Sequence, residues 1–262
     1  MVHKVLHGAL KQAVAWRLLP TNPADGVAVP QPMPRELDVW NATQAAVFLS
    51  AVDDDPRWGA LFLIAIHTGM RRGELLALRW DDIDLERGLV TIRRTMTEDE
   101  NGRDVIGPAP KTRAGRRPIA LAASCVHRLR KHRAQQVERR LLLGPAWDTT
   151  AGELVFDRDD GRLIHADSPG VALDRLAERL GLPRIRFHDL RHTMARVGLV
   201  EGVHPKVIQE RLGHSSIAMT LDRYSHVSAE LQRAGAERLE AALGRPRQVG
   251  GDQDVTEAAE AG

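Results

Sequence analysis

The chain has 262 residues, 43% of them hydrophobic, so it is long and apolar enough to bury the core of one large domain. Its single cysteine, Cys125, excludes an intramolecular disulfide and a metal site built from several cysteines. The formal net charge is only +2, but the stretch 251–262 holds four acidic residues and no basic one, so the rest of the chain is more basic than the sum indicates.

The sequence also lacks the apolar segments that direct a protein to or through a membrane. Its longest apolar run, around residues 58–67, is too short to span a bilayer, and the N-terminus lacks the apolar core of a signal peptide. We therefore expect a cytoplasmic protein with no membrane partner.

The first predicted element is an amphipathic helix over residues 5–16, followed by a proline-rich stretch that reaches Pro34. One helix cannot bury its apolar face alone. Residues 1–36 are therefore interpreted as the remaining helix of an N-terminal domain, followed by a linker.

The main domain, predicted over residues 37–245, opens with a helical capping signal. Asn41 is followed three positions later by Gln44, which is typical of a capping box at the start of a helix. The next run, 58–67, is apolar nearly all round and predicts a helix in the centre of the core. A shorter helix is predicted over 74–80.

From Gly88 the apolar period changes to two, which predicts a strand, and residues 105–121 are predicted to form the arms of a hairpin around a basic turn. A short strand is predicted at 154–156, and the polar tail 246–262 is predicted to be disordered. The fold class is therefore mostly α with a small antiparallel β-sheet (α+β). The later helices are predicted at 122–142, 168–180, 188–199, 205–212, 217–224 and 229–243.

Three segments combine cations, imidazoles and a hydroxyl in a pattern that packing does not require. They are Thr68-Gly-Met-Arg-Arg-Gly-Glu74, His188-Asp-Leu-Arg-His192, and Leu212-Gly-His214 with a tyrosine ten residues later. Together with the hairpin lysine Lys111, this ordered set resembles the tyrosine recombinase family, the phage-type integrases, from about residue 41 to residue 243. The resemblance implies a site-specific DNA recombinase that cleaves and rejoins strands through a 3′-phosphotyrosine intermediate.

Two arginines are the expected phosphate clamp of such a site. Displacement at a phosphodiester adds negative charge to the non-bridging oxygens, and a guanidinium is permanently charged and planar, which suits those oxygens. We assign Arg71 and Arg191 to this role, as the resemblance also implies. His188 lies three residues before Arg191, so the two side chains are expected on one helix face.

The nucleophile and the proton donors follow from the same pattern. Tyr224 is the only tyrosine of the chain, so no other residue can supply a phenol. A phenol with a pKa of about 10 needs a base or a cationic pocket, and His188 is placed to accept its proton. The resemblance assigns Lys111 as general acid for the departing 5′-oxygen and His214 as a donor to a phosphate oxygen.

Further charged residues are expected around these groups. Glu74 is expected to orient Arg71 rather than to transfer a proton. Phosphate contacts that give affinity without sequence information are expected from Arg72, Arg113, Arg116 and Arg117.

The expected partners are double-stranded DNA, three further copies in a homotetramer, and an accessory directionality factor. No cofactor and no metal is expected, because His188 and His192 have i, i+4 spacing without a following glutamate or a third ligand. The helix 229–243 packs either on its own domain or on a neighbouring subunit. Two alternatives stay open: DNA relaxation of the type IB topoisomerase kind, and a truncated, non-catalytic DNA-binding remnant.

Overall fold

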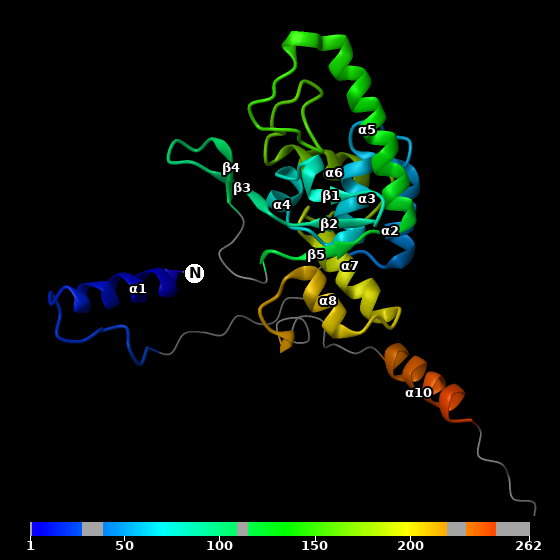
Figure 1. The fold of residues 1–262 in the computed structure, drawn as a ribbon. Helices are drawn as coiled ribbons and strands as arrows, with labels where there is room; N and C mark the ends of the chain where they lie inside the picture. The colour runs from blue at the N-terminus through cyan, green and yellow to red at the C-terminus, as the bar shows by residue number, and fades with distance from the viewer. Residues whose placement is uncertain (1, 28–38, 109–114, 219–228, 245–262) are drawn as a thin grey trace, which may run out of the picture. The chain divides into compact units, whose positions relative to one another are not determined.

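The structure is a computed structural model that describes residues 2–27, 39–108, 115–218 and 229–244 (Figure 1). The chain divides into two compact units, Met1–Leu37 and Asp38–Gly262. In the first unit, helix α1 (Val2–Ala15) buries none of its side chains. The turn after α1 is held to it by the Asn22 side-chain amide, which donates to the carbonyl oxygen of His7 at 3.2 Å.

Helices α2 (Ala42–Val52) and α3 (Gly59–Thr68) begin the second unit and confirm the two predicted helices. The predicted capping box is present, with the Asn41 carbonyl oxygen Oδ1 accepting from the backbone N–H of Gln44 at 2.8 Å. Helix α3 is buried along most of its length and lies against α2, α5 and α7, as its all-round apolar sequence predicts.

The remaining helices surround α3 or extend the domain toward its C-terminal end. Helix α4 was predicted over 74–80 but covers Arg72–Leu76, because the Glu74 carboxylate caps the backbone N–H of Arg71 and starts the helix earlier; residues Trp80–Asp82 form a separate 3₁₀ turn. Five further helices have bounds within one or two residues of the predictions: α5 (Ala123–Leu143), α6 (Ser168–Arg179), α7 (Asp189–Val200), α8 (Pro205–Leu212) and α10 (Ala229–Leu243). Most of the helix predicted over 217–224 and all of the tail predicted over 246–262 lie outside the described residues.

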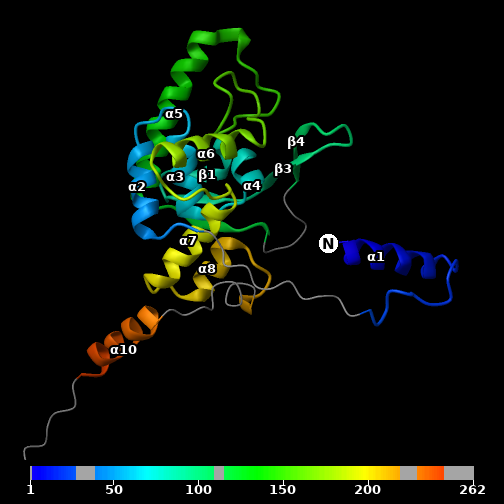
Figure 2. The same cartoon turned by 180° about the vertical axis from the view of Figure 1, so that it is seen from behind.

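The strands form two small antiparallel sheets. One has the order β1-β2-β5, with β1 (Ile83–Asp84), β2 (Leu89–Thr91) and β5 (Pro118–Ala120). The other pairs β3 (Arg94–Glu98) with β4 (Asp104–Pro108), and this hairpin projects from the helical core in both views (Figures 1 and 2). The fold class is therefore mostly α with small antiparallel sheets, as predicted.

The predicted hairpin over 105–121 is wrong in its pairing. Strand β4 pairs back with β3, and β5 pairs with β2, so the two predicted arms belong to different sheets. The tight turn lies at 99–103 instead, where the Asp99 carboxylate accepts from the backbone N–H of Asn101 and Arg103, and Gly102 has a φ of 72°. Residues 109–114, which include Lys111, lie outside the described residues.

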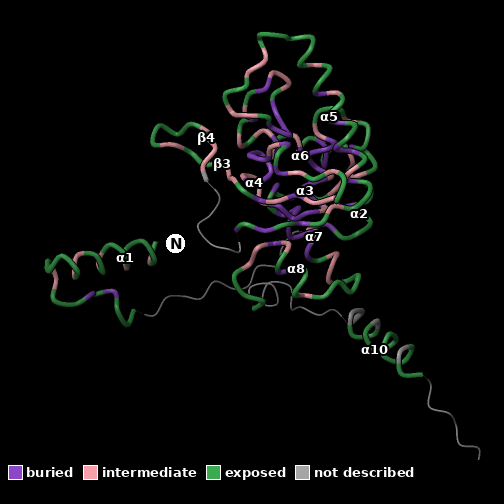
Figure 3. The backbone as a smooth tube through the Cα atoms, in the orientation of Figure 1, coloured by how far each residue is buried: buried purple, intermediate pink, exposed green. Residues whose placement is uncertain are grey.

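The buried residues, which Figure 3 colours along the backbone, form one main core and a small second cluster. The main core includes a chain of aromatic rings from Trp40 through Phe48 and Phe62 to Phe187. The second cluster, between α7 and α8, contains Ala195, Ile208 and Leu212. The strand predicted at 154–156 is only a single bridge, in which Leu154 pairs with Arg79, although all three residues are buried.

Candidate active site

Arg71 and Glu74 form the first part of the site, at the start of α4. The Glu74 carboxylate accepts from the backbone N–H of Arg71 at 2.9 Å and from its guanidinium at 2.8 Å. The Glu74 side chain is fully buried, whereas 40% of the Arg71 side chain is exposed. A buried carboxylate therefore holds an accessible guanidinium.

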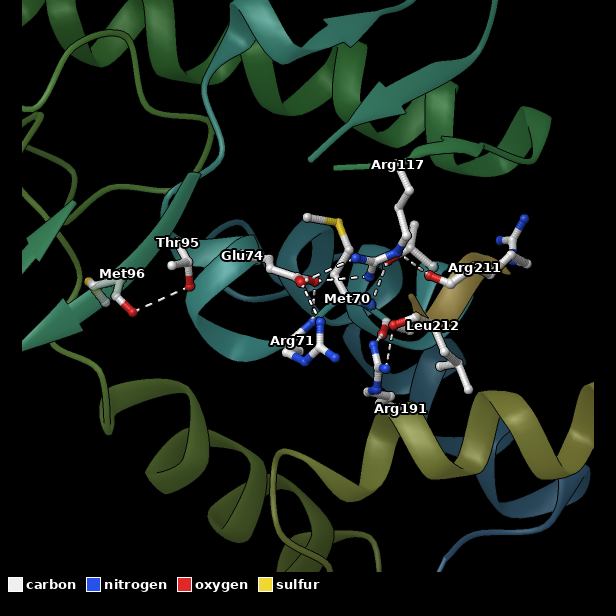
Figure 4. A network of polar contacts seen from close by, with 11 residues as sticks. Met70, Arg71, Glu74, Thr95, Met96, Arg117, Arg191, Arg211 and Leu212 are labelled. Carbon is white, nitrogen blue, oxygen red and sulfur yellow. Dashed lines mark hydrogen bonds and ion pairs between the residues drawn. The ribbon is translucent and has the colours of Figure 1, made fainter. Parts of the chain in front are cut away.

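Arg117 binds the same carboxylate from the opposite side (Figure 4). Its two terminal nitrogens donate to Glu74 at 3.2 and 3.0 Å, and its Nε donates to the backbone carbonyl of Arg211 at 2.6 Å. Burial alone would raise the pKa of Glu74, but hydrogen bonds and charge from Arg117, and then from Arg71, hold the pKa below its ordinary value. Glu74 is therefore held as a carboxylate.

Arg191 connects three distant segments. It lies in the first turns of α7, is buried, and donates to the carbonyl oxygen of Gly69 at 2.6 Å and to that of Leu212. Gly69 precedes Arg71 by two residues, and Leu212 precedes His214 by two residues. The guanidinium thus brings together the three segments that carry the sequence pattern (Figure 4).

His188 lies at the N-cap of α7 and is exposed, while His192 is buried beneath it. Their rings meet edge to face with centroids 5.0 Å apart. Partial desolvation lowers the pKa of His188, and the positive charges of Arg191 and Arg71 lower it further. The imidazole is therefore favoured in its neutral form, which can accept a proton.

His214 is held by its backbone at the end of α8. Gly213 ends the helix in the left-handed conformation, with a φ of 64°. The backbone N–H of His214 then donates to the Gln209 carbonyl at 3.1 Å, and the Gln209 side-chain amide donates to the His214 carbonyl at 3.0 Å. Sequence reasoning missed Gln209, whose signal would have been a polar residue beside Ile208 on the buried side of α8.

The predicted DNA contacts have different surroundings. Arg72 pairs with Asp167 at 2.9 Å, Arg116 is exposed, and Arg117 lies in the interior. The predicted residues Arg113, Lys111 and Tyr224 lie outside the described residues.

Metal and membrane features can be examined in the same described part of the chain. It contains no group of three or more histidine, cysteine or acidic side chains that could hold a metal ion. Among the described helices, none combines the length and the apolar composition that crossing a membrane requires.

Comparison with known proteins connects this geometry to a family. Residues 41–230 match the profile described as the phage integrase family, and the matched range includes the four catalytic candidates that lie in the described part of the chain, Arg71, His188, Arg191 and His214. The chain belongs to the phage integrase family. These are tyrosine recombinases, and the match confirms the resemblance that the sequence pattern indicated.

Two curated phage integrase relatives show the extent of the similarity. A tyrosine recombinase XerC-like protein of Caldanaerobacter subterraneus subsp. tengcongensis is 35% identical over 192 residues, covering 70% of this chain and 49% of that protein. The ICEBs1 integrase of Bacillus subtilis is 27% identical over 231 residues, covering 87% of this chain and 61% of that protein. The chain thus spans about half to three fifths of the length of these relatives.

Solved structures share the phage integrase fold. The Tn1549 transposon integrase in complex with transposon right end DNA superposes with a TM-score of 0.73 at 23% identity, over 90% of this chain and 77% of that one. The crystal structure of XerA recombinase gives a TM-score of 0.57 at 23% identity, over 90% of this chain and 72% of that one. At this level of identity the similarity establishes the fold.

Proposed function

We propose that this chain is a site-specific DNA recombinase that cleaves and rejoins DNA strands through a 3′-phosphotyrosine intermediate. The observation that carries the proposal is the position of Arg191. Its guanidinium binds two backbone carbonyls, one two residues before Arg71 and the other two residues before His214. Packing alone does not require two buried or half-buried arginines and two histidines at the meeting point of three segments. Such a set of donors is suited to a phosphodiester that gains negative charge in its transition state.

In the proposed reaction, the Tyr224 phenol oxygen attacks the phosphorus atom, a Tyr–O–P bond forms, and the bond from phosphorus to the 5′-oxygen breaks. His188 accepts the phenol proton, and Lys111 gives a proton to the departing 5′-oxygen. Arg71, Arg191 and His214 bind the non-bridging oxygens. A 5′-hydroxyl of a second strand then attacks the phosphorus atom, a new bond from phosphorus to the 5′-oxygen forms, and the Tyr–O–P bond breaks to release the Tyr224 phenol. The energy of the first broken bond is thus conserved, and rejoining requires no nucleotide cofactor.

The proposed partners follow from this chemistry. The substrate is double-stranded DNA, and the Tn1549 transposon integrase, of similar fold, is described in complex with transposon DNA. Exchange between two duplexes involves four cleaved strands, so we propose a homotetramer on DNA, with an accessory directionality factor. Because its substrate is chromosomal or mobile-element DNA, we place the protein at the nucleoid in the cytoplasm. Arg72, Arg113 and Arg116 are proposed to contact flanking phosphates.

Trapping of the covalent intermediate tests this proposal. A duplex with a nick close to the scissile phosphate loses the 5′-hydroxyl fragment after cleavage, so a competent site accumulates a protein–DNA adduct that survives denaturation. Because no candidate target sequence is assigned, the substrate is a pool of randomised nicked duplexes, from which adducts are recovered and sequenced. We expect an adduct whose protein–DNA linkage maps to the tryptic peptide that contains Tyr224.

The control is Tyr224→Phe, which removes one oxygen atom from the chain's only tyrosine. This variant is expected to lose the adduct and to bind the recovered duplexes with the affinity of the unchanged chain. An adduct that persists in Tyr224→Phe contradicts the nucleophile assignment. Binding without an adduct in the unchanged chain supports the non-catalytic alternative instead.

A further inference from the structure

Arg117 has a position that its sequence neighbourhood does not suggest. It follows the segment 109–114, which contains Lys111, and immediately precedes β5. Arg117 is 6% exposed and Ile119 is 1% exposed, whereas the neighbouring Arg116 is exposed. The carbonyl of Arg117 accepts from the backbone N–H of Ile92 at 3.0 Å, so its backbone is fixed to the sheet.

The Arg117 guanidinium shares the Glu74 carboxylate with Arg71. Figure 4 shows Glu74 between the two arginines, and both oxygens of the carboxylate accept from Arg117. A two-point contact between a guanidinium and a carboxylate fixes orientation as well as distance. Because Glu74 is fully buried, its orientation depends on these two arginines, and the half-buried Arg71 depends on Glu74.

Arg117 also reaches the end of α8, where a second arginine is held. The successive carbonyls of Arg211 and Leu212 accept from Arg117 and Arg191. The last carbonyls of a helix lack partners within the helix and lie at the negative end of its dipole, so they suit guanidinium groups. The same helix end leads through Gly213 to His214.

From these contacts we propose that Arg117 is a positioning residue for strand cleavage. It orients Glu74, and through Glu74 the phosphate-binding Arg71, and it ties the backbone just before β5 to the same carboxylate and to α8. The inference rests on the proposed function and goes beyond it, since Arg117 acts through other residues and does not contact a DNA phosphate. Both terminal nitrogens of Arg117 bind the Glu74 carboxylate and its Nε binds the Arg211 carbonyl, so its charge is paired inside the protein, which favours this role over a phosphate contact.

The first test replaces Arg117 by methionine, which keeps most of the length and removes the charge and the donors. We expect the rate of adduct formation at saturating DNA to fall on the order of 100-fold, because a small displacement of a reacting group has an effect of that size. DNA affinity is expected to stay unchanged. The matched control is Arg130→Met, which removes an arginine from an exposed pair with Glu86 at 2.9 Å and is expected to change neither quantity.

Arg117→Lys keeps the charge but loses the planar two-point contact. This conservative variant is expected to cleave faster than Arg117→Met but more slowly than the unchanged chain. It replaces Arg117→Met in the test if that variant does not fold. Losses of rate and affinity in equal proportion in Arg117→Lys would identify Arg117 as a DNA contact and overturn the proposal. An unchanged rate in a folded variant would overturn it as well.

The pH dependence separates positioning from support of the fold. Among the described residues, Glu74 faces the guanidinium of Arg71 from its own helix and that of Arg117 from the start of β5. Without Arg117, the buried Glu74 carboxylate keeps only one neighbouring cation, so its pKa rises. As the pH is lowered, the variant is therefore expected to lose cleavage at a higher pH than the unchanged chain does. Adding Glu74→Gln to Arg117→Met is expected to remove this extra acid dependence. A purely structural role would lower the melting temperature and leave the pH profile unchanged.

A measurement without DNA keeps this inference separate from the proposed function. In protein labelled with ¹⁵N-arginine, the Arg71 guanidinium signal is identified by its loss in Arg71→Lys. We expect this signal to shift in Arg117→Met and Arg117→Lys and to stay in place in Arg130→Met. If the Arg71 signal shifts but the chain forms no adduct, the proposed function is wrong and the positioning role stands. If the Arg71 signal stays in place in both Arg117 variants, the positioning role is wrong.

Discussion

At the scale of single residues, the site combines groups that are exposed with groups that hold them from the interior. Arg71 and His188 are accessible, whereas Glu74, Arg117 and His192 are buried. Buried polar groups must be paired, since an unpaired one costs about 1–3 kcal/mol. The interior groups are therefore fixed by their own partners, and they fix the exposed groups in turn.

His188 provides a prediction about pH. As the proposed base, His188 must be neutral, so the rate of cleavage should fall as the pH drops through its pKa. Desolvation and the nearby arginines lower this pKa from its ordinary value of 6.5, so the fall is expected at a lower pH than for an ordinary histidine. The measurement is the rate of adduct formation in a single turnover, followed from about pH 5 to pH 8.

Two variants test whether His188 causes the fall in rate at low pH. His188→Asn should be slower and should lack the acid fall, because its amide does not titrate. His127→Asn, at an exposed position of α5, should keep the profile of the unchanged chain. An acid fall that keeps its midpoint in His188→Asn would assign the base to a different group.

The sequence indicated the candidate residues of its short motifs more readily than a residue outside those motifs. Arg71, His188 and Arg191 follow from short local patterns, because their chemistry requires specific residue types at specific spacings. The burial of Arg117 was missed because a basic neighbourhood favours solvent. The sequence feature that indicated this burial is the spacing of two residues between Arg117 and Ile119, because residues two apart in an extended segment lie on the same face.

At the scale of elements, helices were predicted more closely than strand pairing. A helix is specified by neighbours in sequence, such as Asn41 and Gln44 at the start of α2. A strand pattern specifies a face but not a partner, so β4 and β5 were assigned to each other. The Asn101-Gly102 turn was the stronger hairpin signal, since this pair favours the positive φ values of a tight turn.

Gly69, the C-cap of α3, tests how an element positions the site. Its φ is 65°, and an added Cβ would lie 2.3 Å from the Met194 methyl carbon and 3.0 Å from Leu212 Cδ2. Gly69→Ala should therefore lower the free energy of unfolding by more than the ~1–2 kcal/mol that the left-handed conformation alone costs. It should also slow cleavage, because the Gly69 carbonyl anchors Arg191. Urea denaturation and the rate of adduct formation measure the two effects.

Gly102→Ala is the matched control for this substitution. Gly102 has a φ of 72° in the β3–β4 turn, and an added Cβ there meets nothing within 4 Å. The control should show the backbone strain without the contacts and should cleave normally. Equal effects of the two substitutions would mean that packing against Leu212 and Met194 does not position the site.

At the scale of the whole molecule, the two units differ in how many hydrophobic side chains they bury. Nearly all of the buried hydrophobic side chains belong to the second unit, whereas α1 buries none. The polar face of α1 and the turn after it carry exposed basic residues, which are Lys4, Lys11 and Arg17. Hydrophobic burial stabilises a fold, and basic surface residues supply affinity for DNA, so removal of the first unit should separate the two properties.

Deletion of residues 1–37 should shift the melting temperature of the second unit by less than about 2 °C, because little apolar burial is lost. The same deletion should weaken DNA binding and make the slope of log affinity against log salt concentration less steep, since fewer phosphates are neutralised. A full-length chain with Lys4, Lys11 and Arg17 replaced by glutamine should reproduce the smaller slope without the deletion. If the slope stays unchanged in both proteins while the melting temperature falls, the first unit supports the fold of the second and does not bind DNA.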